Sequence, residues 1–203
     1  MLALLPASAL TADTLTVAVA SNFATTAAAL ADAFTADNGT PVRLSIGSTG
    51  KLYAQIIHGA PYDVFLAADA ERPQLLEASG HGVRGTRLTY AIGGLVVWSS
   101  DPRVAGRDCR EVLVSGDYAH IALANPETAP YGAAARQTLE ALGLWDTASE
   151  RAVFGENIAQ TLQFVATRNA SLGLIAASQV DSKQLPEATC QWPVPTNLHA
   201  PIE

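Results

Sequence analysis

The stretch of sequence that decides the fold, residues 47–69, reads GSTGKLYAQIIHGAPYDVFLAAD. A small hydroxyl turn, residues 47–50, leads into a segment whose apolar residues recur at helical spacing. Residues 59–61, GAP, end that helix, and the apolar run 64–68 predicts a buried strand. A Ser-Thr pair before a helix supplies a hydroxyl cap and leaves amide groups of the first turn free for an anion. The alternative is an ordinary capped helix.

A second turn of the same kind occurs nearer the N-terminus. Residues 15–20, LTVAVA, predict a strand that ends in Ser21-Asn22, and residues 23–34 then show one apolar helical face. Apolar and polar residues alternate over 42–46, which predicts a second strand. Strands that alternate with helices predict an α/β fold with a mostly parallel sheet, whose ligands lie at the carboxyl ends of the strands. Both polar turns belong to that edge, which favours the anion site.

The remaining elements continue the alternation of helices and strands. We expect helices at 70–79, 133–142 and 158–167, and strands at 90–98, 120–124 and 171–176. The long apolar run 90–98, with its central Gly93-Gly94, suits a segment that crosses from one lobe to another. Residues 125–132 read as a turn-rich loop, and residues 186–203 contain no clear helix.

The composition excludes some functions. The 203 residues are 49% hydrophobic and carry a formal net charge of −7 without a basic run. This charge argues against nucleic acid or an anionic membrane as a partner. Residues 1–14 predict a signal remnant or a disordered tail, because Ala7-Ser8-Ala9 resembles a signal-peptidase site. No apolar stretch is long enough to span a membrane.

Catalytic and metal-binding patterns are weak in this sequence. The four histidines are scattered, and GSTG is not the G-x-S-x-G turn of a hydrolase, so we expect no enzyme. Cys109 and Cys190 lack metal-ligand spacing, and whether they pair stays open at this point. We interpret Lys51 as a solvated helix residue, because it follows the hydroxyl turn instead of lining it.

Five motifs in order resemble the periplasmic molybdate-binding proteins of ABC transporters. They are VAVASNFA at 17–24, the stretch 47–69, ANPETAPYG at 124–132, GENI at 155–158 and LGLIAAS at 172–178. The resemblance covers residues 15–203. It implies a type II periplasmic-binding-protein fold, with two α/β lobes and a ligand cleft between them. Lobe 1 would comprise residues 15–91, with 187–203 returning to it, and lobe 2 residues 92–186.

Family members usually continue with further helices that complete the first lobe. We therefore expect this lobe to be truncated at the C-terminus, and whether the chain is stable without those helices stays open.

The resemblance also implies a set of ligand-binding residues. These residues are Ser21, Asn22, Ser48, Thr49, Tyr131 and the backbone N–H of Ile158. Tyr131 stands where one branch of the family has a tyrosine, and Ala176 occupies the place of the tyrosine that another branch uses. Which of Ser48 and Thr49 donates its hydroxyl stays open.

The resemblance implies a binding protein, with no cofactor and no directly bound metal. It would be an exported, periplasmic monomer that captures molybdate or tungstate, whose metal is held through its oxo groups. Its partner would be the membrane permease of an ABC transporter. One alternative is a site for sulfate, phosphate or another tetrahedral oxyanion. The other is a cytoplasmic ligand-sensing domain of a regulator.

Overall fold

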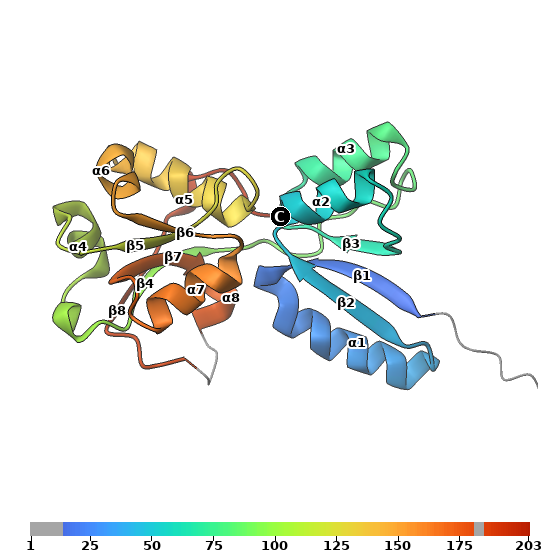
Figure 1. Ribbon diagram of the computed structural model, residues 1–203, viewed down its shortest axis with the longest axis horizontal. Coiled ribbons are helices and arrows are strands. Elements are labelled where there is room, and N and C mark those ends of the chain that lie inside the picture. The colour runs from blue at the N-terminus through green and yellow to red at the C-terminus, as the bar shows by residue number, and fades with distance from the viewer. Residues whose placement is uncertain (1–13, 181–184) are drawn as a thin grey trace, which may run out of the picture.

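Two α/β lobes, each with its own sheet, make up the computed structural model (Figure 1), which describes residues 14–180 and 185–203. The type II fold that the sequence predicts is confirmed. The predicted signal remnant or tail, residues 1–14, lies outside the described residues except for Thr14. Among the described helices, none is both long and apolar enough to cross a membrane.

The smaller lobe contains a three-stranded parallel sheet in the order β2-β1-β3. Its strands are β1 (Leu15–Ala20), β2 (Val42–Gly47) and β3 (Val64–Leu66). Its helices are η1 (Ser21–Phe23), α1 (Ala24–Asn38), α2 (Thr49–Ile57) and α3 (Glu71–Ser79). Helix α1 covers one face of the sheet, and α2 and α3 cover the other (Figure 1). Both polar turns therefore lie at the carboxyl ends of neighbouring parallel strands, as the sequence predicts.

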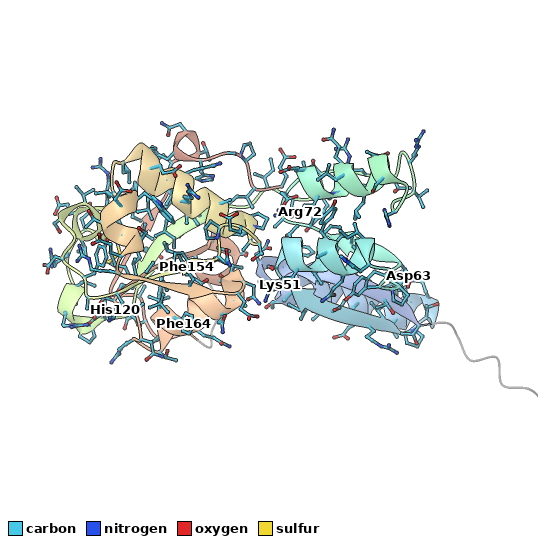
Figure 2. The ribbon with its side chains drawn as sticks, turned by 45° about the horizontal axis from the view of Figure 1, so that its top comes forward. Lys51, Asp63, Arg72, His120, Phe154 and Phe164 are labelled. Atoms are coloured by element: carbon cyan, nitrogen blue, oxygen red, sulfur yellow. A yellow bond between two sulfur atoms is a disulfide. The ribbon has the colours of Figure 1, made fainter. Side chains whose placement is uncertain are left out.

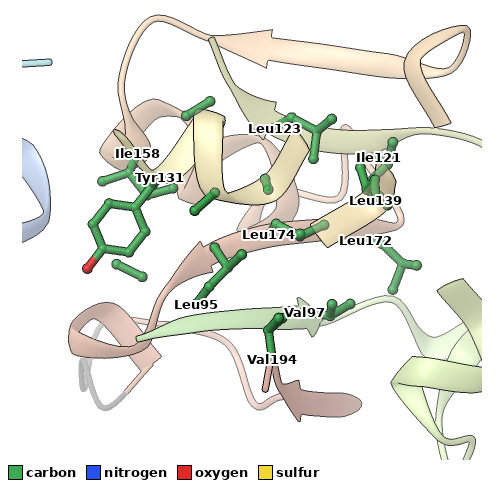
Figure 3. Close-up of a cluster of buried hydrophobic side chains, with 14 of the residues drawn as sticks. Leu95, Val97, Ile121, Leu123, Tyr131, Leu139, Ile158, Leu172, Leu174 and Val194 are labelled. Atoms are coloured by element: carbon green, nitrogen blue, oxygen red, sulfur yellow. The ribbon is translucent and has the colours of Figure 1, made fainter. Parts of the chain in front are cut away.

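The larger lobe contains a five-stranded mixed sheet in the order β6-β5-β7-β4-β8. Its strands are β4 (Leu95–Ser99), β5 (Ile121–Ala124), β6 (Ala152–Gly155), β7 (Leu172–Ala176) and β8 (Cys190–Pro193). Its helices are η2 (Pro102–Val104), α4 (Cys109–Ser115), α5 (Pro130–Ala141), α6 (Trp145–Ser149), α7 (Ile158–Ala166), α8 (Ala177–Val180) and η3 (Thr196–Leu198). Strand β5 pairs in parallel with β6 and β7, and β4 pairs antiparallel with β7 and β8. A cluster of buried aliphatic side chains between this sheet and α5 forms the main core (Figure 3).

Several predicted boundaries differ from the structure, and two of them bear on the site. The strand expected at 90–98 begins only at Leu95, where the chain gains β7 and β8 as neighbours on either side. Residues before it form the crossing between the lobes, where Gly93 makes an isolated bridge with Ile202. Helix α5 begins at Pro130 and not at residue 133, because proline is well suited to the first turn of a helix. Tyr131 thus lies in a helix and not in a loop.

The C-terminal segment also departs from the predicted return of residues 187–203 to the smaller lobe. Residues Cys190–Pro193 instead form β8, the edge strand of the larger sheet. A disulfide joins Cys190 to Cys109 at the start of α4, with 5.3 Å between their Cα atoms, and holds the segment there. Only the last residues reach the crossing, where the Gly93 amide donates to the Ile202 carbonyl at 2.7 Å. We retain 15–91 as the proposed limits of the smaller lobe, and the proposed larger lobe comprises 92–186 together with the segment that carries β8.

Candidate functional site

A pocket lies between the two lobes and brings all six predicted site residues together. About 190 Å³ of empty space, its opening included, lies within the pocket. The smaller lobe contributes Ala20, Ser21, Asn22, Gly47, Ser48, Thr49 and Ala68, and the larger lobe contributes Ala129, Pro130, Tyr131 and Ile158. Among these described lining residues none has a charged side chain. Any ion held here would therefore be bound by neutral donors.

Four helix N-termini meet at this pocket. Helix η1 begins at Ser21, α2 at Thr49, α5 at Pro130 and α7 at Ile158, and each of these residues lines the pocket. The first turn of a helix has N–H groups without intrahelical partners, and its dipole places partial positive charge at this end. The arrangement therefore favours an anion although no cationic side chain lines the pocket.

Ser48 has an unusual environment for a serine at a helix N-cap. It occupies the N-cap position of α2 with extended backbone angles, yet its side chain makes no capping hydrogen bond. The sequence-based expectation that this hydroxyl caps the helix is therefore wrong. Ser48 is only 3% exposed, and its Oγ has no hydrogen-bond partner in the described part of the chain. An unpaired buried hydroxyl costs about 1–3 kcal/mol, so its place on the pocket wall points to a ligand.

Thr49 is fully buried beside it and has a different role. Its Oγ1 accepts a hydrogen bond from the Ala68 amide at 3.0 Å. The contact orients the hydroxyl and leaves its own hydrogen free to donate. Ser48 and Thr49 are therefore both able to donate into the pocket, and the sequence offered no means of separating them.

Tyr131 presents a phenol to the pocket from the first turn of α5. Its ring packs into the main core, and Figure 3 shows its oxygen at the outer edge of the apolar cluster. Burial, with a smaller contribution from Tyr90, raises the pKa of Tyr131 to about 12, although a hydrogen bond with the Asn22 side chain opposes the shift. The phenol is therefore a protonated donor at neutral pH. The Asn22 carboxamide from the opposite lobe lies beside it.

Ile158 lines the pocket as the first residue of α7. The preceding residue, Asn157, caps this helix. Its carboxamide oxygen accepts hydrogen bonds from the backbone amides of Ala159 at 3.0 Å and Gln160 at 3.1 Å. The cap fixes the direction of the first turn. The Ile158 amide precedes those two, at the end of the helix that faces the pocket.

Direct contacts across the pocket rim join the lobes. The Gly50 amide donates to the Thr128 carbonyl at 2.8 Å, and the Ser178 hydroxyl donates to the Asn22 carbonyl at 3.0 Å. Lys51 forms an ion pair with Glu156 at 2.9 Å. Figure 2 shows Lys51 at the boundary between the lobes, whereas Asp63 lies at the far end of the smaller lobe. Lys51 is a solvated helix residue that does not line the pocket, as expected, since its side chain is 47% exposed, and it also makes this ion pair to the other lobe.

The fold and the pocket together define a class of protein. Two α/β lobes that close over a donor-lined pocket are the architecture of type II solute-binding proteins. The family profile of bacterial extracellular solute-binding proteins matches residues 15–203, and the chain belongs to this family.

Within this family the chain is ModA-like. It is 47% identical to the molybdate-binding protein ModA of Azotobacter vinelandii, over 92% of this chain and 73% of the relative. It is 42% identical to ModA of Rhodobacter capsulatus, over 92% and 72%. The solved structure of the Azotobacter vinelandii periplasmic molybdate-binding protein matches with a TM-score of 0.85 and 41% identity, over 93% of this chain and 82% of that chain.

Proposed function

We propose that this chain captures molybdate, and also tungstate, in the periplasm and delivers it to the permease of an ABC transporter. The observation that carries the proposal is the buried Ser48 hydroxyl, which has no hydrogen-bond partner among the described residues and lies on the wall of a pocket where helix N-termini meet. The names of the two curated relatives, both molybdate-binding proteins, support the choice of ligand. The proposed role is binding by a monomer, without a cofactor or a catalytic step.

The donor set suits a tetrahedral oxyanion dianion. Such an ion has four oxygens that accept hydrogen bonds and no proton to donate at neutral pH. The proposed donors are hydroxyls, an amide, a phenol and a backbone N–H, from Ser21, Asn22, Ser48, Thr49, Tyr131 and Ile158. Each bond to a charged acceptor contributes about 1.5–3 kcal/mol. The dipoles of the surrounding helices add to this, so the site needs no lysine or arginine.

Size would distinguish molybdate and tungstate from sulfate or phosphate. Their metal–oxygen bonds are longer than sulfur–oxygen or phosphorus–oxygen bonds, so a ring of donors set for the larger ions leaves the smaller ions with stretched contacts. Several poorly made bonds, each worth about 1 kcal/mol, give a large preference. A site for sulfate or phosphate is the alternative, and it predicts the reverse order of affinities.

Calorimetric titration with molybdate, tungstate, sulfate and phosphate tests the proposal. We expect one-to-one binding of molybdate that excess sulfate does not displace. Binding of none of these ions by the folded protein would refute the proposal, and a preference for sulfate would favour the alternative ligand. Cell fractionation tests the compartment, and molybdate uptake by cells with and without the protein tests delivery to the permease.

The phenol of Tyr131 is one donor whose contribution can be measured. Tyr131→Phe should weaken molybdate binding by about ten- to a hundredfold, because it removes one hydrogen bond to a charged acceptor. Tyr118→Phe is the matched control, since Tyr118 is also buried and its pKa is also raised by burial, but it lies outside the pocket. The control should bind molybdate like the parent protein. Equal affinities for the parent and Tyr131→Phe would remove Tyr131 from the site.

The ion pair between Lys51 and Glu156 should stabilise the closed arrangement of the lobes modestly. Both side chains are largely exposed, at 47% and 68%, so the pair is screened by solvent and salt. Lys51→Ala should weaken molybdate binding by about two- to fivefold at low salt, and high salt should reduce the difference. Arg107→Ala, which removes the exposed pair with Asp117 in the larger lobe, is the control and should not change affinity. A loss that is independent of salt would show that Lys51 acts by another route.

A further inference from the structure

Gly93 lies where the crossing between the lobes meets the Tyr131 phenol. A Cβ atom placed on Gly93 would lie far inside van der Waals contact with the phenol oxygen and 3.2 Å from Cζ of the same ring. The Gly93 amide donates to the Ile202 carbonyl at 2.7 Å, which joins the crossing to the C-terminal segment. Gly93, within the crossing, thus meets both the C-terminal segment and a pocket residue.

The need for glycine at this position comes from space and not from backbone conformation. Among the described residues, the glycines with positive φ are at 39, 59, 80, 85, 106, 116 and 143, and Gly93 is not one of them. An alanine would therefore fit its backbone without strain. What it would meet is the phenol oxygen and, at 3.0 Å, the Ile202 Cγ2 methyl.

The phenol has little freedom to move away from such a side chain. Tyr131 is 2% exposed, and its ring packs in the main core with Leu95, Ile158 and Ile202. Restoring ordinary contact with a Cβ at residue 93 would shift the oxygen by about 1 Å. Hydrogen bonds to an oxyanion require about 2.5–3.2 Å between heavy atoms, so a shift of this size breaks or remakes the bond.

We propose that Gly93 is a positioning residue that holds the Tyr131 phenol in place and thereby sets the size of oxyanion that the pocket accepts. The proposal rests on the function proposed above. The backbone of the crossing between the lobes would then determine where this hydrogen-bond donor lies, because the phenol packs against that backbone.

Four proteins test the proposal: the parent, Gly93→Ala, Tyr131→Phe and the double variant. Each is titrated with molybdate and with sulfate, and its unfolding in urea is followed without ligand. Gly93→Ala should lose at least tenfold in molybdate affinity and reduce the ratio of molybdate to sulfate affinity by at least fivefold. In the Tyr131→Phe background the same substitution should change affinity by less than about twofold, because the displaced oxygen is already absent. The contact with Ile202 is the same in both backgrounds, so the difference isolates the phenol oxygen.

Gly94→Ala is the matched control, since among the described residues its Cβ would have one close neighbour, the Ala177 Cβ at 3.2 Å. It should bind both ions within about twofold of the parent. Gly93 is merely structural, and the proposal is overturned, in either of two cases. In the first, Gly93→Ala lowers affinity equally in the parent and in Tyr131→Phe. In the second, it lowers the affinities for molybdate and sulfate by the same factor. If Gly93→Ala does not fold, the double variant should fold, and its failure to do so would also overturn the proposal. Failure of the proposed function is separate, because the parent itself would then bind neither ion or would prefer sulfate.

Discussion

Replacing Ser48 by alanine should weaken molybdate binding by about ten- to a hundredfold without destabilising the ligand-free protein. Its Oγ is buried and makes no hydrogen bond in the described part of the chain, so its removal loses no protein contact. The buried hydroxyl carries a desolvation cost that alanine lacks, and the free energy of unfolding should stay the same or rise by about 1 kcal/mol. Binding loses one charge-assisted hydrogen bond. Calorimetry and urea unfolding of the same preparation measure the two effects.

Ser99 provides the matched control for this substitution. It is also fully buried, but its hydroxyl donates to the Ser171 carbonyl at 2.6 Å and accepts from the Asp101 amide at 3.0 Å. Ser99→Ala should therefore lower the free energy of unfolding by about 1–3 kcal/mol and leave molybdate affinity nearly unchanged. If Ser48→Ala destabilised the ligand-free protein as strongly as Ser99→Ala, its hydroxyl would serve the fold and not the ligand.

The opposite behaviour expected of these two serines shows where sequence reasoning is informative. Two strand–turn–helix patterns are local, and each places a hydroxyl turn at the end of a strand, at Ser21 and at Ser48. Because adjacent parallel strands end at one edge, the two turns were expected to meet, and they do. Whether each hydroxyl caps its helix or stays free depends on backbone geometry within the turn. The sequence pattern predicts the cap, and only the structure shows that Ser48 does not form it.

Contacts between distant segments explain most of the remaining differences. Strand β8 is only four residues long, too short for its alternating burial to identify it from sequence, and its pairing with β4 depends on residues more than ninety positions away. The ion pair of Lys51 with Glu156 arises from the placement of the two lobes, and the approach of Gly93 to Tyr131 arises from tertiary packing. No local periodicity predicts such contacts. Tyr131 was identified through the family resemblance, and its helical setting follows from Pro130 at the start of α5.

Removal of the disulfide should lower the free energy of unfolding of the larger lobe by about 2–4 kcal/mol. The bond joins Cys109 and Cys190 across a sequence separation of 81 residues, so it constrains a long loop in the unfolded chain. In the folded state it ties edge strand β8 to α4. Urea unfolding of Cys109→Ala/Cys190→Ala, compared with the oxidised parent, measures the loss. Cys109 is 1% exposed, so the substitutions are a cleaner test than adding a reductant to the native protein.

The same variant should bind molybdate with nearly the parent affinity where both are folded. Helix α4 lies at the end of the larger lobe away from the smaller lobe (Figure 1), and neither cysteine lines the pocket. The parent unfolded in urea with reductant is the control, because it should resemble the variant if the bond acts through the unfolded chain. A variant as stable as the oxidised parent would show that packing of β8 against β4 suffices. A large loss of molybdate affinity in the folded variant would instead show that a shift of β8 also shifts β4, its neighbour in the sheet, and with it the crossing. Gly93 lies two residues before β4.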